Sequence, residues 1–263
     1  MNDPARIDDG QLDAKKKRAE EGGVWETVKV VAQALLIALV VRTFLFQPFN
    51  IPSGSMIPTL LVGDYLFVSK YSYGYSRYSF PFGLPLFHGR IFGSPPKRGD
   101  IAVFKLPSDD TTDYIKRVIG LPGDRIQMLH GRLVINGKMV PRTPIAPIKT
   151  RDEYGHIIKA PAYTETLPGG VSHTIIQLDG DSGYYSNTGV YVVPPNDYFM
   201  MGDNRDNSTD SRVPPQDGGV GYVPVVNFVG RSEVLFFSVK GPAWEFWKWP
   251  WTVRWRRIFQ LTR

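Results

Sequence analysis

Two serines in a conformationally restricted stretch are the first candidates for chemistry. The sequence IPSGSMIPTL, residues 51–60, places Ser53 and Ser55 among two prolines and a glycine. Proline fixes φ and glycine permits tight bends, so a preset turn is expected around both hydroxyls. A serine on such a turn can expose its hydroxyl beside free backbone N–H groups. An ordinary turn of small residues would have the same composition.

A lysine with apolar neighbours is the second candidate. In YIKRVIGLPGD, residues 114–124, strand alternation places Tyr114, Lys116 and Val118 on one face. Such a lysine commonly extends its amine to water, and the alternative is a desolvated, neutral amine that acts as a base. With a pKa near 10.4, about one copy in 2,500 is neutral at pH 7. Lowering the pKa by about 2 units raises that fraction about a hundredfold and costs roughly 2.7 kcal/mol.

The third candidate is the polar sequence GDNRDNSTDSR, residues 202–212. Short polar side chains of this kind commonly hydrogen-bond to nearby backbone in a surface turn. The density of opposite charges favours a rigid scaffold instead.

An apolar segment precedes the serines and must position them. Residues 24–46 have an uninterrupted apolar-or-Gln part, residues 30–41, that is shorter than the about 20 residues a bilayer requires. Lys29 and Arg42 lie near the ends, where they can extend toward the two interfaces. We expect an uncleaved membrane anchor; a cleaved signal peptide and a buried soluble helix are the alternatives. The basic run Lys15–Arg18 predicts a cytoplasmic N-terminus.

Beyond residue 48 the sequence changes to short apolar or alternating runs separated by turns. The 263 residues include 26 glycines and 22 prolines, which fits many turns between short strands. We therefore predict a mainly β fold, an antiparallel β ectodomain with one N-terminal transmembrane helix, and a hairpin at Asn136-Gly137. Strands are expected at Tyr65–Val68, Asp100–Phe104, Tyr114–Ile119, Arg125–Met128, Arg132–Ile135, Val190–Val193 and Val234–Val239.

Two segments rich in aromatic residues stand apart from these strands. Residues 71–95 contain eight Tyr or Phe, and we expect a long loop folded onto the β core, with an aromatic flap at a membrane surface as the alternative. Residues 241–263 combine tryptophans with basic residues, which suits a membrane surface. Pro250 is expected to break any helix there, and a Trp cluster packed onto the β core is the alternative. The tryptophans are Trp244, Trp247, Trp249, Trp251 and Trp255.

Composition and motifs exclude several classes of site. The sequence has no cysteine, which excludes disulfides, Fe–S clusters, cysteine-based zinc sites and a thiol nucleophile. The four histidines are dispersed, and no Walker A loop, HExxH or EF-hand pattern occurs, so we expect no metal and no cofactor. Gly180–Gly183 is similar to a chymotrypsin-like nucleophile loop, but no histidine has a matching context. Ser94–Lys97 matches S-x-x-K, but its two prolines prevent a helical turn.

The candidates occur in a recognisable order. After the apolar segment come IPSGSMIPTL, GDYLFVSK, KRGDIAVF, YIKRVIGLPGD and MGDNRDNSTDSR. Over roughly residues 30–240 this order resembles bacterial type I signal peptidase (leader peptidase), whose motifs are long and specific. The resemblance implies a Ser–Lys dyad with Ser55 as nucleophile and Lys116 as general base. It also implies an oxyanion hole formed by Ser53 and the Ser55 N–H, and an amine positioned by Ser208. The supporting motif positions are Asp210, Arg212, Arg117, Asp203 and Arg205.

The resemblance also implies an activity and a location. The activity is a serine endopeptidase that removes signal peptides from exported preproteins, cutting after small residues by acyl-enzyme chemistry. The implied partners are signal-peptide-bearing preproteins, membrane lipid and the nearby export machinery, with no nucleic acid. The implied location is the bacterial inner membrane, single-pass, with the N-terminus cytoplasmic and the catalytic domain periplasmic. Residues that flank the candidates and could line shallow apolar pockets are Phe49, Ile51, Met56, Leu60, Tyr114 and Ile115.

The expected organisation follows from these assignments. Enterobacterial members of the family have two spans before the catalytic domain, whereas one is found here, which leaves topology open. Two other classes remain: a non-catalytic tethered β module that binds envelope proteins, and a self-cleaving Ser–Lys repressor-type protease, although the latter are soluble. The expected parts are a polar tail (1–23), an anchor (24–46), a catalytic β core (47–130 and 195–240), an inserted β region (131–194) and a membrane-surface tail (241–263).

Overall fold

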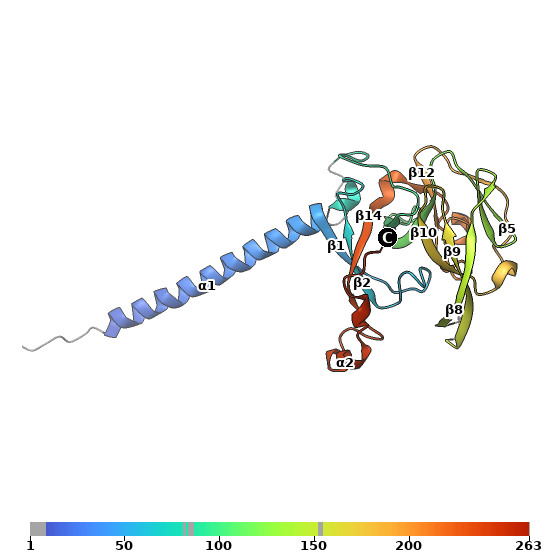
Figure 1. Cartoon of the computed structure of the whole chain (residues 1–263). Coiled ribbons are helices and arrows are strands. Elements are labelled where there is room, and N and C mark those ends of the chain that lie inside the picture. The colour runs from blue at the N-terminus through green and yellow to red at the C-terminus, as the bar shows by residue number, and fades with distance from the viewer. Residues whose placement is uncertain (1–8, 81–82, 84–86, 152–154, 263) are drawn as a thin grey trace, which may run out of the picture. The chain divides into compact units, whose positions relative to one another are not determined.

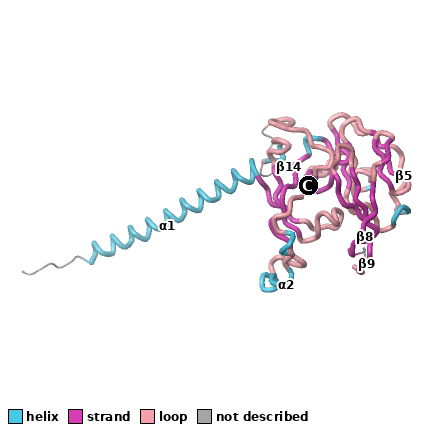
Figure 2. Tube along the Cα trace, in the orientation of Figure 1, coloured by secondary structure: helices cyan, strands magenta, loops and turns pink. Residues whose placement is uncertain are grey.

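The chain divides into a helical unit, Met1–Arg42, and a β-rich unit, Thr43–Arg263 (Figures 1 and 2). The computed structural model describes residues 9–80, 83, 87–151 and 155–262, with side chains from residue 24 onward. The basic run Lys15–Arg18 therefore has no described side chains.

The N-terminal unit is one long helix. Helix α1 spans Asp9–Val40, and the π-helical turn η1, Val41–Leu45, follows it. Residues Val24–Leu45 are long and apolar enough to cross a membrane, with a mean hydropathy of 2.0. Leu35 and Ile37 are exposed, unlike the core side chains of a soluble protein. The helical segment ends one residue before the expected anchor boundary, because Phe46 already pairs with a strand.

The β-rich unit is built on a seven-stranded antiparallel sheet. Strands distant in sequence are neighbours in it, since the last long strand, β14, lies between β2 and β3. Ala102 of β3 pairs with Lys116 of β4, which fixes the lysine in the sheet. In order across the sheet the strands are β1 (Phe46–Asn50), β2 (Asp64–Ser69), β14 (Phe228–Ser238), β3 (Ile101–Lys105), β4 (Asp113–Gly120), β12 (Asp197–Met201) and β13 (Val223–Pro224).

Two smaller antiparallel sheets come from the sequence between β4 and β12 (Figure 1). The first joins β11 (Tyr191–Val192), β5 (Arg125–Leu129), β6 (Arg132–Ile135) and β7 (Lys138–Met139). The second joins β10 (Ser172–Ile176), β9 (Ile157–Thr166) and β8 (Arg142–Arg151). Strand β5, at the end of the expected core segment 47–130, forms a hairpin with β6, with Ile126 opposite Ile135.

The predicted hairpin is confirmed between β6 and β7. Asn136 and Gly137 have φ values of 53° and 76° and connect Ile135 to Lys138 across the turn. Positive φ at both central residues is the type I′ geometry, which matches the twist of the flanking strands. All seven expected strand segments are also confirmed, although β14 begins at Phe228, six residues before the prediction.

The aromatic segment 71–95 folds onto the core in part, as expected. Tyr73 and Tyr78 are buried, whereas Phe92 is exposed. Residues 81–82 and 84–86 lie outside the described part of the chain. The segment contains the 3₁₀ turn η2, Arg77–Ser79, which Ser76 caps.

The C-terminal segment differs from the prediction at Pro250. The residue does not interrupt a helix but lies in the first turn of α2, Trp249–Thr252, where its missing N–H is not needed. The 3₁₀ turns η7, Phe246–Lys248, and η8, Trp255–Arg257, flank α2. The remaining 3₁₀ turns of the described chain are η4 (Gly180–Ser182), η5 (Pro215–Asp217) and η6 (Val225–Asn227).

Candidate active site

The loop between β1 and β2 carries both candidate serines. Ile51 N–H donates to Asp64 O at 2.8 Å and Gly63 N–H donates to Ile51 O at 2.9 Å, so the two ends of the loop are tied together. Met56 and Leu60 have fully buried side chains that anchor the loop in the hydrophobic core. The sequence analysis placed these two side chains in an apolar pocket. In the structure they pack into the core and so anchor the loop to the sheet.

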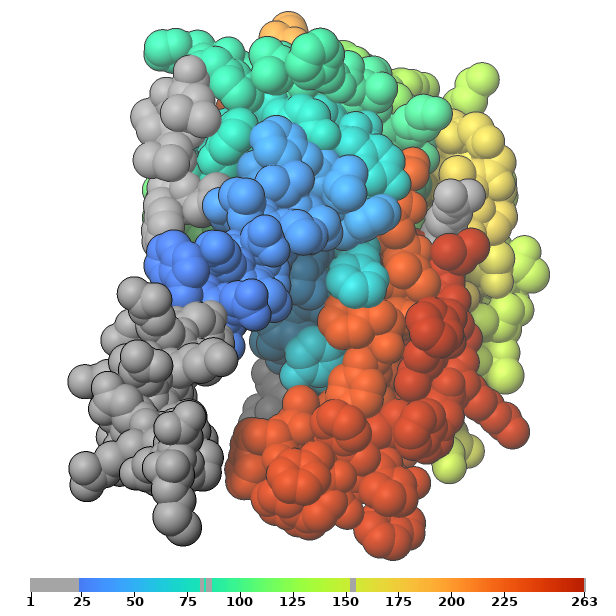
Figure 3. Space-filling view, turned by 90° about the vertical axis from the view of Figure 1, so that its left-hand side faces the viewer, coloured from blue at the N-terminus to red at the C-terminus, as the bar shows by residue number. Residues whose placement is uncertain are grey.

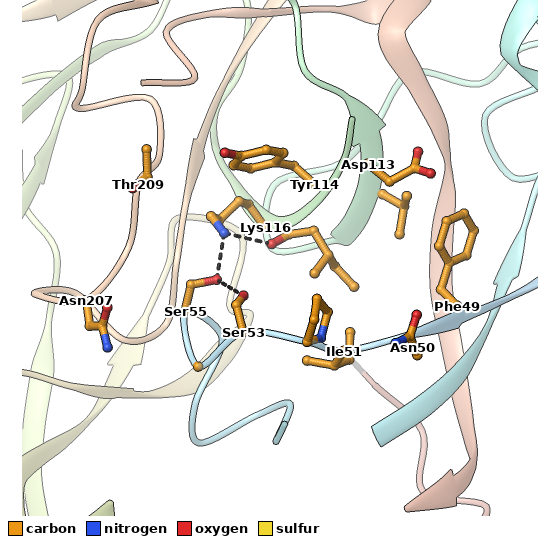
Figure 4. A pocket seen from close by; sticks show the side chains of 14 residues that line it. Phe49, Asn50, Ile51, Ser53, Ser55, Asp113, Tyr114, Lys116, Asn207 and Thr209 are labelled. Atoms are coloured by element: carbon orange, nitrogen blue, oxygen red, sulfur yellow. Dashed lines mark hydrogen bonds between the residues drawn. The ribbon is translucent and has the colours of Figure 1, made fainter. Parts of the chain in front are cut away.

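Lys116 of β4 meets Ser55 of this loop (Figure 4). Lys116 Nζ donates a hydrogen bond to Ser55 Oγ at 2.6 Å and a longer one to Ile115 O at 3.2 Å. Ser53 Oγ lies 3.4 Å from Ser55 Oγ. Lys116 is 4% exposed and Ser55 is 7% exposed, whereas Ser53 is open to solvent. The structure thus brings three residues from two distant motifs into one hydrogen-bonded group.

Burial changes the acid–base properties of the lysine. Desolvation lowers the pKa of Lys116 to about 8, although the nearby carboxylates of Asp210 and Asp203 favour its charged form. The Tyr114 ring lies 5.4 Å from Nζ, measured to its centroid. At pH 8 about half of such amines are neutral, and about one in ten is neutral at pH 7. A neutral amine can accept the serine proton, so the pair can act as nucleophile and base.

Two buried ion pairs surround the dyad. Arg117 donates to both carboxylate oxygens of Asp203 at 2.8 and 2.7 Å, and Arg212 donates to both oxygens of Asp210 at 2.9 and 2.8 Å. Burial alone would raise the pKa of both aspartates, but the arginines hold each pKa below its ordinary value. These four residues, chosen from sequence as supporting positions, therefore form charged pairs with fixed geometry.

A third buried pair includes a residue that the sequence analysis missed. Arg205 Nη1 donates to Glu165 Oε1 at 2.9 Å, and its Nη2 contacts the second carboxylate oxygen. His173 Nε2 lies 3.5 Å from Glu165 and 3.8 Å from Asp203. Desolvation lowers the pKa of His173 to about 4, so its ring is neutral at pH 7. Glu165 and His173 come from β9 and β10, outside every motif, and no local pattern marks them.

Three residues position the serine loop through contacts that sequence reasoning did not assign. Asn204 donates from its backbone N–H to Ser55 O at 3.0 Å and from Nδ2 to Gly54 O at 3.1 Å. Thr59 Oγ1 donates to Asp203. A Cβ at Gly202 would lie 2.5 Å from Ser55 O, so only glycine fits this approach. Asn204 and Gly202 belong to the GDNR motif, which was the available signal.

Ser208 lies beside the dyad without bonding the amine. Its side chain is 9% exposed, and the hydrogen bonds of Lys116 Nζ in the described chain go to Ser55 and Ile115 instead. The Ser208 hydroxyl is among the groups that lower the pKa of Asp210. Its expected role in orienting Lys116 therefore stays a prediction.

A cleft opens in front of the dyad. It contains four of the six expected pocket residues, and polar groups of Asp113, Asn207 and Thr209 border it (Figure 4). Strand β4 pairs with β3 over residues 113–117, whereas its ladder with β12 covers only Arg117–Gly120. Residues 113–116 thus have one strand edge toward the cleft. The apolar lining residues named from sequence are Phe49, Ile51, Tyr114 and Ile115.

Comparison with known proteins gives consistent matches over most of the chain. The family model described as "Signal peptidase, peptidase S26" matches residues 24–237. Signal peptidase I of Rickettsia typhi (strain ATCC VR-144 / Wilmington) is 45% identical over 218 residues, covering 80% of this chain and 79% of the relative. Signal peptidase I of Rickettsia canadensis (strain McKiel) is 40% identical over 244 residues, covering 90% and 86%.

Among solved structures, a signal peptidase I from Enterococcus faecalis V583 aligns with 24% identity and a TM-score of 0.29, covering 52% of this chain and 97% of that chain. The family match and the relatives, taken with the Ser55–Lys116 geometry, show that the chain belongs to the signal peptidase family, peptidase S26.

Proposed function

We propose that this signal peptidase removes signal peptides from preproteins with Ser55 as nucleophile and Lys116 as general base. The observation that carries the assignment is the 2.6 Å contact between Nζ and Oγ inside a desolvated site. An exposed lysine would be protonated at neutral pH, but desolvation lowers the pKa of Lys116 to about 8. Both the geometry and the protonation state therefore suit proton transfer from Ser55.

In the first step, neutral Lys116 takes the hydroxyl proton as Ser55 Oγ attacks the scissile carbonyl. The new bond joins Oγ to the carbonyl carbon, and the carbonyl oxygen becomes an oxyanion. The Ser55 backbone N–H and the Ser53 hydroxyl are the proposed donors to that oxyanion. In the described chain no backbone carbonyl accepts a hydrogen bond from Ser55 N–H, which leaves it available.

In the second step, protonated Lys116 gives its proton to the leaving amine, and the peptide bond breaks. Ser55 is left as an ester of the signal peptide. Lys116 then takes a proton from water as the water oxygen bonds to the ester carbon. The bond from that carbon to Ser55 Oγ breaks, Lys116 returns the proton to Oγ, and the signal peptide leaves with a free carboxyl group. The carboxylate pairs of Asp203 and Asp210 stay with their arginines throughout and serve to fix the lysine's surroundings.

The cleft suits an extended peptide with apolar side chains. The edge of β4 at residues 113–116 can accept a peptide as an added strand, with backbone hydrogen bonds supplying affinity. Ile51, Tyr114 and Ile115 line the adjoining surface and favour apolar side chains. Small side chains beside Ser55 are part of this proposal because the resemblance to the signal peptidase family implies them.

The N-terminal helix supplies the membrane attachment. We assign Val24–Leu45 as a single pass through the bacterial inner membrane, with the basic run Lys15–Arg18 on the cytoplasmic side. The β-rich unit then lies on the periplasmic side, where exported preproteins emerge near the export machinery. This placement brings the dyad to the side of the membrane on which signal peptides end.

The C-terminal segment provides a second lipid contact in this proposal. Figure 3 shows this segment at the red end of the colour scale, and several of its aromatic side chains are exposed. Trp251 is 81% exposed, and Lys248 and Arg256 are also exposed. Exposed tryptophan is stabilised at headgroup depth, and cations are attracted to anionic lipid. The exposed aromatic residues are Trp244, Phe246, Trp247, Trp251, Trp255 and Phe259.

Incubation of the full-length protein in detergent with a preprotein tests the assignment, with the N-terminus of the product sequenced. The wild type should give one new N-terminus after a small residue. Ser55→Ala should give none while its melting temperature stays near that of the wild type. Cleavage by Ser55→Ala at the wild-type rate would show that another residue is the nucleophile.

A further inference from the structure

Two arginines of the C-terminal segment hold the loop that carries Ser55. We propose that Arg257, assisted by Arg254, is a positioning residue for catalysis: it clamps the β1–β2 loop from outside and so sets the place of the nucleophile. The proposal rests on the proposed role of Ser55. Neither arginine lies in a motif of the active site, and residue 257 follows Ser55 by about two hundred positions.

Arg257 bridges two separate points of the loop. Its Nη2 donates to Thr59 O at 2.9 Å and to Asp64 Oδ2 at 2.6 Å, while Nε donates to Asp64 Oδ1 at 3.2 Å. Thr59 follows the serine turn, whereas Asp64 ends the loop and begins β2. A planar guanidinium with fixed donors thereby sets the distance between these two points.

Asp64 is 0% exposed, so its carboxylate must be satisfied by hydrogen bonds and a counter-charge within the protein. Its carboxylate also accepts from Leu61 N–H at 2.8 Å and from Ser238 Oγ at 2.6 Å. Its backbone carbonyl accepts from Ile51 N–H, at the other end of the loop. A buried carboxylate requires a compensating charge, and Arg257 supplies the closest one.

Arg254 adds a third point of attachment. Its Nη2 donates to Val62 O at 3.0 Å and its Nη1 donates to Ser238 Oγ at 3.0 Å. Within the described chain, no backbone N–H donates to the Thr59 or Val62 carbonyl. The loop therefore relies on the C-terminal arginines, rather than on its own backbone, at both positions.

The clamp reaches the dyad by two short routes. Leu60 N–H donates to Met56 O at 2.9 Å, which connects the clamped end of the loop to the residue after Ser55. Thr59 Oγ1 donates a hydrogen bond to Asp203, which in turn pairs with Arg117. Because Arg117 follows Lys116 in β4, this route connects the loop to the strand that carries the base. A shift of about 1 Å at a reacting atom can cost about a hundredfold in rate, so small loop displacements matter.

The test compares Arg257→Ala with Arg256→Ala in the full-length protein in detergent. Arg256 is an exposed neighbour, so the control removes the same charge from the same turn. Three quantities are measured: kcat and KM on one preprotein, the melting temperature, and amide hydrogen exchange of peptides covering residues 51–64 and 113–120. Arg257→Lys keeps a charge without the two-pronged geometry and serves as the milder variant.

We expect Arg257→Ala to lower kcat about tenfold or more with KM changed less than about twofold, because the reacting atoms and not the cleft are displaced. Exchange should increase in residues 51–64 and stay unchanged in 113–120. Arg257→Lys should lie between wild type and Arg257→Ala, and Arg256→Ala should match the wild type.

Two results would overturn the clamp. One is wild-type kcat in Arg257→Ala. The other is a fall in kcat without faster exchange in residues 51–64. If Arg257→Ala is unfolded at the assay temperature, Arg257→Lys decides by the same two readouts. A wild-type protein that fails to cleave, or an active Ser55→Ala, would instead refute the proposed function and is recognised in the control reactions.

Discussion

Lys116 Nζ lies 2.6 Å from Ser55 Oγ in a site where neither side chain is more than 7% exposed. Desolvation lowers the pKa of Lys116 to about 8, against 10.5 for a free lysine. The folded protein therefore holds a base that an unfolded chain would hold as a cation. This arrangement makes both properties depend on pH: the activity up to about pH 8, and the stability between about pH 8 and 10.5.

The activity should rise with pH through the Lys116 pKa. Because the neutral amine is the reactive form, kcat/KM should increase as pH rises toward about 8 and level off above it. Lys116→Arg should be inactive at every pH, since a guanidinium does not lose its proton in proteins. The measurement is a pH–rate profile on one preprotein. An acidic limb near 10.4 would mean that Lys116 titrates as an ordinary exposed lysine.

The stability of the folded protein should change with pH above the pKa of Lys116, whereas the activity changes below it. Between about pH 8 and 10.5 the unfolded state binds more protons at this residue than the folded state, so the contribution of Lys116 to stability rises with pH there. Below pH 8 both states are protonated and the penalty for burying the cation is constant. Lys116→Met should therefore stabilise the protein at pH 7 by about 1–3 kcal/mol while abolishing cleavage. Urea unfolding at pH 7 and pH 10 measures the free energy of unfolding of the wild type and of Lys116→Met. If this free energy changed equally with pH in both proteins, the depressed pKa of Lys116 would be refuted.

The hydroxyl of Ser53 should matter more in the transition state than in the ground state. Its Oγ lies 3.4 Å from Ser55 Oγ, close to where an oxyanion would form. Ser53→Ala should lower kcat by about 10²–10³, or about 2.7–4 kcal/mol, the usual loss for one such donor. KM should change little, because an oxyanion-hole donor interacts mainly with charge that develops in the transition state. Wild-type kcat in this variant would leave the oxyanion hole to backbone groups alone.

The Arg117–Asp203 pair should be structural rather than catalytic. Asp203→Asn leaves the fully buried guanidinium of Arg117 without its counter-charge, which should destabilise the protein by about 3–5 kcal/mol. Replacing both residues at once, as Arg117→Met with Asp203→Leu, should recover part of this loss because no lone charge remains. Urea unfolding of Arg117→Met, of Asp203→Leu and of the double variant gives the coupling energy. Additive losses would show that the two side chains act independently.

Local sequence patterns were sufficient to locate the strands but not to determine which strands pair with each other. Alternation and turn residues located Arg132–Ile135 and the Asn136-Gly137 turn, since both depend on a few adjacent residues. The position of β14 between β2 and β3 has no local signal, because it depends on pairing across more than a hundred residues. Met56 and Leu60 were misplaced for the same reason: an apolar residue beside a nucleophile can face a pocket or the core, and only the fold decides.

In the candidate site, too, the sequence identified some residues and missed others. Ser55 and Lys116 stood out because chemistry restricts which residues can act as nucleophile and base, and long motifs fixed their positions. Contacts that hold the loop, such as Arg257 with Thr59 O, involve a backbone carbonyl, and no residue type marks such an acceptor. Glu165 reaches Arg205 from an inserted strand for which the motifs give no register.

The exposed tryptophans of the C-terminal segment should bind lipid even without the transmembrane helix. A protein lacking residues 1–42 keeps the whole β-rich unit, including the pairing of Phe46 with Ser69, and should sediment with anionic vesicles.

Replacing Trp247, Trp251 and Trp255 by serine removes exposed aromatic surface without touching Arg254 or Arg257, and should weaken this binding at least about tenfold. Added salt should weaken it further, because the basic residues contribute an electrostatic part. Tyr184→Ser, which removes one exposed ring from the loop after β10, is the control and should bind like the parent. Vesicle binding that survives the triple replacement in a folded protein would mean that another surface meets the membrane.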